Sequence, residues 1–121
     1  MATYSKIPLS QSTNGRAVLV SLSSSPPVLI HRTDTTSTNV DEVWLYASNI
    51  TNIDSTITLY WGGSAATDVI FTATVQAYAG LVILVPGLIL TGTGASSSAV
   101  YALCQQPSAI EITGYINKIT A

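Results

Sequence analysis

Apolar and polar residues alternate with a period of two along most of the chain, and no window keeps the spacing of an amphipathic helix. This alternation predicts short strands and almost no helix. It runs through residues 17–22, 28–31, 43–50, 55–61, 69–75, 81–85, 88–90, 100–104 and 109–116. We therefore expect an all-β protein, a single-domain antiparallel β-sandwich that is jelly-roll-like and has about eight or nine short strands.

Two of these stretches predict a central hairpin. Residues 43–50 and 55–61 are separated by the turn-forming sequence TNID, and we expect a three-residue loop at 51–53. The expected cross-strand partners are Val43 with Trp61, Leu45 with Leu59, and Ala47 with Ile57. Since neighbouring side chains alternate in direction, the other face of the pair would carry Trp44, Tyr46, Thr58 and Tyr60. An aromatic face of that size should be covered by the second sheet or by a neighbouring subunit.

The sequence LVILV at residues 81–85 is continuously apolar, which is typical of a strand buried on both faces. Pro86-Gly87 follows and fits a type II turn that leads into residues 88–90. We expect residues 81–90 to be the most buried segment and to lie near a subunit interface, with Ile83 as a contact residue. In the last strand, Gly114 predicts a bulge or a close approach of another backbone.

We divide the chain into residues 1–16, an N-terminal arm or edge strand, and residues 17–121, the β-sandwich domain. Pro8 removes a backbone donor and limits this segment to an edge or an extended path. Tyr4, Ile7 and Leu9 are its candidate contact residues. We expect an arm that touches a partner, and the alternative is an edge strand that Asn14-Gly15 folds back onto residues 16–22.

The composition is poor in charge. Hydrophobic residues make up 47% of the chain and charged residues 8%, whereas an ordinary soluble domain has about 25% charged residues. Sixteen Thr and 15 Ser take the place of charge, which suits a surface packed against neighbours. The net charge is −2 with only four Lys and Arg residues, so we expect no binding to nucleic acid. The first ten residues lack a signal-peptide layout and no apolar run reaches 18 residues, so we expect neither secretion nor membrane insertion.

Candidate chemistry is sparse. His31 is the single histidine and no motif places it beside a nucleophile, although a Ser–His–Asp arrangement formed in space stays open at this point. Asp34, Asp41 and Glu42 match no calcium loop. Cys104 is the single cysteine and is predicted to be a core residue. We expect no enzyme activity, no cofactor and no metal.

Four segments resemble a known class of proteins: VDEVWLYASNIT, TLYWGG, LVILVPGLILTG and ITGYINKIT. They are similar to small structural proteins encoded among the virion genes of tailed bacteriophages, and the resemblance covers roughly residues 40–119. It implies a β-sandwich or jelly-roll subunit, often trimeric, that decorates the head or forms part of the neck or tail. Residues 1–16 have no equally clear counterpart.

We therefore expect a phage virion structural protein, made in the host cytoplasm and located in the virion. Its preferred role is a head decoration (cement) protein that stabilises the capsid through subunit contacts. Its expected partners are its own copies, as a homotrimer, and the major capsid protein or another virion protein. The alternatives are a neck or tail component and a carbohydrate-binding module, which would use Trp44, Trp61 or Tyr60 as stacking platforms and would expose a coplanar aromatic pair flanked by carboxylates.

Overall fold

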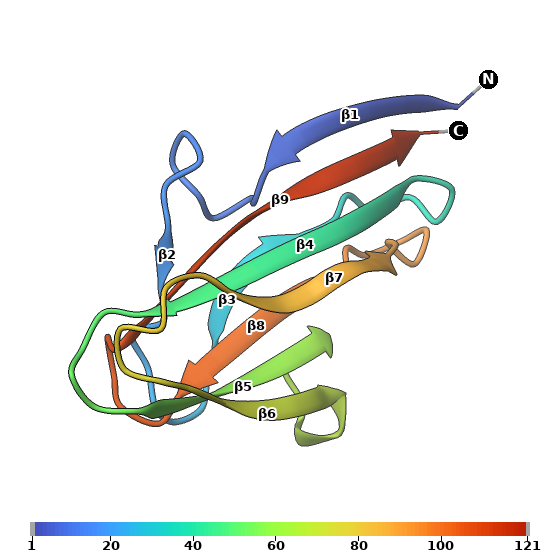
Figure 1. Ribbon diagram of the computed structural model, residues 1–121. Coiled ribbons are helices and arrows are strands. Elements are labelled where there is room, and N and C mark those ends of the chain that lie inside the picture. The colour runs from blue at the N-terminus through green and yellow to red at the C-terminus, as the bar shows by residue number, and fades with distance from the viewer. Residues whose placement is uncertain (1, 121) are drawn as a thin grey trace.

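The computed structural model describes residues 2–120, which form two antiparallel sheets packed face to face (Figure 1). The strands are β1 (Thr3–Pro8), β2 (Val18–Leu19), β3 (Val28–Arg32), β4 (Val40–Asn49), β5 (Ser55–Gly62), β6 (Val69–Val75), β7 (Val82–Leu90), β8 (Ala99–Cys104) and β9 (Ile110–Thr120). Within these residues the one helical element is the three-residue 3-10 turn η1 (Ala66–Asp68). The expected all-β sandwich is confirmed.

The strands pair in a nested order. β1 and β2 both pair with β9 and together form one interrupted edge strand, while β3 pairs with β8, β4 with β7, and β5 with β6. The chain is thus one long hairpin rolled into two sheets, which is the arrangement of a jelly roll. The five-stranded sheet has the order β1-β9-β4-β7 with β2 beside β9, and the four-stranded sheet has the order β3-β8-β5-β6.

The core lies between the sheets and is built by the alternation seen in the sequence. Val43, Leu45 and Ala47 on β4 face Ile57 and Leu59 on β5, and all five are fully buried. The same face of β9 contributes the buried Ile110, Ile112 and Ile116, and Cys104 is buried on β8 as predicted. Because buried and half-buried residues alternate along β4 and β5, their outward-facing residues lie on the two outer faces of the sandwich.

The predicted central hairpin is wrong. β4 pairs with β9 and β7, whereas β5 pairs with β8 and β6 in the other sheet, so residues 50–54 cross between the sheets. The residues expected to pair across a ladder belong instead to strands that face each other through the core. The predicted aromatic face is divided as well: Trp44 and Tyr46 lie on the outer face of the five-stranded sheet, and Thr58 and Tyr60 on that of the four-stranded sheet.

The prediction that residues 81–90 are the most buried segment is also wrong, while their place near a subunit interface stays a prediction. β7 is an edge strand with β4 as its neighbour, so one of its faces and its outer edge meet solvent. Ile83 and Ile89 are each 61% exposed, and Val85 is the buried residue of the strand. Pro86 and Gly87 do not turn the chain. The partners of β4 step from Leu88 to Pro86, which leaves Gly87 as the extra residue of a β-bulge.

The N-terminal segment is an edge strand of its own sheet. β1 pairs with β9 from Thr3 opposite Thr120 to Pro8 opposite Tyr115. Asn14 and Gly15 both have positive φ, but β2 continues along β9 rather than pairing with β1. The predicted fold-back onto residues 16–22 is therefore wrong, while contact with a partner stays a prediction.

Gly114 makes the close backbone approach that the sequence predicted. Its φ is +153°, and a Cβ at this position would overlap the carbonyl oxygen of Trp44 on the neighbouring β4. Only glycine leaves room for that carbonyl, so β9 and β4 can stay paired along their whole length.

Candidate functional site

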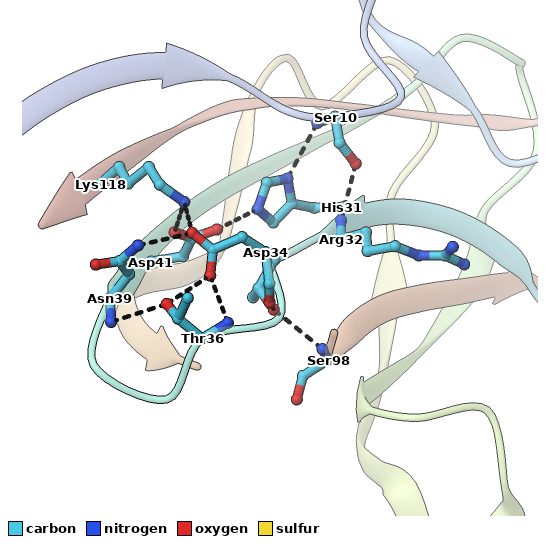
Figure 2. A network of polar contacts seen from close by, with 10 residues as sticks. Ser10, His31, Arg32, Asp34, Thr36, Asn39, Asp41, Ser98 and Lys118 are labelled. Atoms are coloured by element: carbon cyan, nitrogen blue, oxygen red, sulfur yellow. Dashed lines mark hydrogen bonds and ion pairs between the residues drawn. The ribbon is translucent and has the colours of Figure 1, made fainter. Parts of the chain in front are cut away.

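The most concentrated polar chemistry lies where the end of β3, the start of β4 and the end of β9 meet (Figure 2). His31 on β3 and Asp41 on β4 come from opposite sheets, and each side chain is 3% exposed. His31 Nε2 lies 2.7 Å from Asp41 Oδ2. The Ser10 main-chain N–H donates to the other ring nitrogen, Nδ1, at 3.0 Å.

These contacts assign the tautomer of His31. A backbone N–H can only donate, so Nδ1 must accept, and the ring proton lies on Nε2 and is donated to Asp41. Ser10, His31 and Asp41 therefore resemble a hydrolytic triad in composition only. The Ser10 hydroxyl is turned away from the imidazole and accepts the Arg32 N–H at 2.8 Å, whereas a triad needs the hydroxyl on the ring.

Lys118 on β9 extends the cluster to the loop before β4. Its Nζ lies 2.8 Å from Asp34 Oδ2 and 3.4 Å from Asp41 Oδ1. The pKa of Asp34 is well below its usual range, mainly because Lys118 donates a hydrogen bond to its carboxylate and secondly because Asn39 does. Burial acts in the opposite direction but is outweighed. Burial alone would lower the pKa of Lys118, but the hydrogen bond to Asp34 and the charges of both carboxylates outweigh it and raise that pKa.

The cluster is best described as a clip between chain segments. It joins Ser10, two residues after β1, to both sheets and to the loop at 33–39. Residues 2–120 contain no buried side-chain nitrogen or oxygen without a hydrogen-bond partner. No group of three or more His, Cys, Asp or Glu side chains in that part of the chain is placed to hold a metal ion. The buried polar atoms of the cluster are thus all engaged with other parts of the same chain.

A second feature is a row of side chains across the outer face of the five-stranded sheet. The rings of Trp44 and Tyr115 stack with centroids 6.0 Å apart and planes 11° apart. Because β9 lies between β1 and β4, Lys6 covers the other face of Tyr115, with its Nζ 4.8 Å from the ring centroid. On the far side of Trp44, a Cβ on Gly87 would come within 2.9 Å of the indole.

This aromatic row is better suited to stabilising the sheet than to binding a sugar. Each ring is flanked on both sides by a neighbour from an adjacent strand, and Trp44 also donates its Nε1–H to Glu42 Oε1 at 2.8 Å. Sugar stacking needs an aromatic face open to solvent. Of the other platform candidates, Trp61 packs against the core and Tyr60 is half-buried opposite Tyr101.

The third feature is the long side of the sandwich formed by β6, β7 and Leu81, which we call the open side. Apolar side chains stand exposed along it, and a groove of about 250 Å³ runs between the two strands. The exposed large apolar residues of this side are Val69, Ile70, Leu81, Ile83, Leu88 and Ile89. Residues 69–110 contain no Asp, Glu, Lys, Arg or His, so neither strand carries a charge.

The opposite long side is closed by the chain itself. Between β2 and β3 the chain crosses from one sheet to the other, and its main chain bonds to both. Val20 donates its N–H to the Ile110 carbonyl on β9 at 2.9 Å, and the Leu22 carbonyl accepts from Cys104 on β8 at 3.1 Å. The His31–Ser10 contact ties the residues after β1 to the same side.

The structure separates the seven predicted contact residues. Ile83 and Tyr4 are exposed on the two opposite edges of the five-stranded sheet, while Leu9 is buried in the core and Ile7 packs against it. Trp44, Tyr46 and Tyr60 are half-buried on outer faces. Leu81, Leu88 and Ile89 belong to the segment 81–90 that was predicted to lie near an interface, whereas Val69 and Ile70 were not predicted, although the sequence already shows that residues 69–110 carry no charge.

No family model, curated protein or solved structure matches this chain. Between residues 2 and 120, none of the helical structure has the length and apolar character to cross a membrane.

Proposed function

We propose that this chain is a virion structural protein of a tailed bacteriophage, with head decoration (cement) as its role. It would act without catalysis, through contacts with its own copies, as a trimer, and with the major capsid protein. The observation that carries the proposal is the open side, where apolar side chains stand exposed on two strands without charge.

The open side supports a role in protein–protein contact, and the resemblance to phage structural proteins supports a place in the virion. Large exposed apolar patches on a small domain mark protein–protein surfaces, because leaving them in water is unfavourable. The jelly roll occurs in viral capsid and lectin domains, but a fold alone does not assign a function. The virion setting rests on the segments around Trp44, Trp61, Pro86 and Tyr115, which resemble phage structural proteins.

The polar cluster and the aromatic row favour this proposal over the alternatives. An enzyme needs a positioned reactive group, and Ser10 turns its hydroxyl to the main chain of Arg32. A carbohydrate-binding module needs a free aromatic face, and Trp44 and Tyr115 are flanked on both sides. A neck or tail location would use the same kind of contact surface, so the experiment has to locate the protein.

The test is the composition of purified virions of the phage that carries the gene. We expect mass spectrometry to find the chain in many copies per particle, and antibody labelling in the electron microscope to place it on the head. Particles from a gene-deletion phage should bind the added full-length protein and regain resistance to heat. Labelling confined to the neck or tail would replace the decoration role, and absence of the chain from virions would refute the proposal.

A further inference from the structure

We propose that the open side is the surface on which a second copy of this chain packs, through side-chain contacts and without addition of a strand to either sheet. This inference rests on the proposed function, since it identifies which surface makes the contacts between copies. It depends on three properties of the open side: its charge, its shape and the irregularity of its edges.

The charge of the open side favours a copy of the same chain over a foreign partner. All four Lys and Arg residues and all six Asp and Glu residues lie outside residues 69–110, so β6, β7 and the connection between them are uncharged. Surfaces that select a foreign partner commonly do so through complementary charge. Two copies of an uncharged surface meet with no like charges opposed and no charge left buried without a partner.

The shape of the open side provides both halves of a contact. The groove is lined on β6 by Phe71, Ala73, Thr74 and Val75 and on β7 by Val82, Ile83 and Leu84. Leu81 stands exposed just before the groove residues of β7, and Leu88 and Ile89 stand exposed farther along the same strand. Apolar ridges of one copy can therefore fill the groove of the next, and a three-fold ring closes when each copy gives its ridges to one neighbour and its groove to the other.

The edges themselves oppose pairing by main chain. In β7, Leu84 and Gly87 are extra residues relative to β4, and in β6 Ile70 is extra relative to β5. Pro86 also has no N–H to give. Bulges and proline at an edge interrupt the regular row of donors and acceptors that an added strand needs. Contact between copies is therefore left to the side chains.

The test is the molar mass of the full-length protein in solution, measured by light scattering from micromolar to about 100 µM concentration. The variant is Ile83→Lys, which changes a 61% exposed residue and should leave the fold intact. The matched control is Tyr4→Lys, at a residue 67% exposed on β1, the opposite edge of the same sheet. Thermal melting by circular dichroism checks that both variants are folded.

We expect the wild type to form a closed oligomer, Tyr4→Lys to match it, and Ile83→Lys to dissociate with an affinity weaker by at least about tenfold. A monomeric wild type overturns the inference, and so does an oligomer that Ile83→Lys leaves intact. Hydrogen exchange tests the contact mode, because alternating new protection along the β7 amides on assembly would indicate strand addition and contradict side-chain packing. A monomeric chain found on virion heads would refute this interface and the trimer, while the decoration role itself would stand.

Discussion

Removal of the Asn49 side chain tests how the chain crosses between the sheets after β4. Asn49 is 2% exposed and uses its whole amide: Nδ2 donates to the carbonyls of Ile53 at 2.8 Å and Val75 at 3.0 Å. Oδ1 accepts from the Thr51 N–H at 2.9 Å and the Thr51 hydroxyl at 2.7 Å. One side chain thus holds the 50–54 crossing against the end of β6.

The expected loss follows from the two hydrogen bonds to the carbonyls and from the buried Val75 carbonyl, which loses this partner, whereas the Ile53 carbonyl can still accept from the Thr51 hydroxyl at 3.1 Å. Each hydrogen bond contributes about 1 kcal/mol net, and a buried group without a partner costs about 1–3 kcal/mol. The bonds to Thr51 are closer to solvent, so water can replace part of them. For Asn49→Ala we expect the free energy of unfolding to fall by about 3 kcal/mol. With an unfolding entropy of about 2.1 cal/mol/K per residue, this lowers the melting temperature by about 12 °C.

The assay is urea denaturation followed by fluorescence, with thermal melting as a second readout. The control is Asn52→Ala in the same crossing, where the side chain is exposed, and its effect should stay within about 0.5 kcal/mol. Asn49→Asp should cost at least as much as Asn49→Ala at pH 7, because a carboxylate oxygen would face two carbonyl oxygens. The reasoning is refuted if Asn49→Ala behaves like the control or if Asn49→Asp matches the wild type.

Three further predictions concern the polar cluster and the tightest backbone contact. Asp41→Ala removes the buried partner of His31 and should lower the free energy of unfolding by about 3 kcal/mol in denaturant titration; a change below about 1 kcal/mol would contradict the clip. Asp34→Asn should cost at most about 1 kcal/mol at pH 7, because the carboxylate is partly exposed. Lys118 lowers the pKa of Asp34 in the folded state, so the Asp34 carboxylate stabilises the fold above about pH 4 and this stabilisation is lost as the pH falls. The free energies of unfolding of wild type and variant should therefore converge in acid titrations. A difference that grows in acid would contradict the lowered pKa. Gly114→Ala should destabilise by more than about 3 kcal/mol or prevent folding, and a soluble variant with wild-type melting would show that the strands can move apart.

Much of the fold could be predicted because a strand buried on one face needs alternating residues. The pattern identified the inward residues of β4 and β5, the shared face of Ile110, Ile112 and Ile116, and the burial of Cys104. It also placed a close approach at Gly114, where a glycine interrupts an otherwise regular strand. These predictions only require knowing whether a residue faces the core or solvent, and the apolar or polar character of each side chain indicates that.

The clip and the aromatic row depended on contacts between distant segments. Asp41 and Lys118 are 77 residues apart, and Lys118 and Asp34 are 84 apart, so no local spacing announces them. Lys6, Trp44 and Tyr115 come together only because the nested pairing sets β1, β9 and β4 side by side. Each of these residues occupies an ordinary position in its own strand, and only the order of the strands in the sheet brings them into contact.

The sequence by itself determined that the chain forms strands, which residues of most strands face the core, and that the surface has little charge. The tertiary structure alone decided which strands are neighbours, because a two-residue period specifies the face of a residue and says nothing of the strand beside it. The turn residues at 51–54 are equally compatible with a hairpin and with a crossing between sheets. For the same reason, an apolar run such as residues 81–85 fits a buried central strand or an exposed edge, and in this protein the rolled order of strands puts it at the edge.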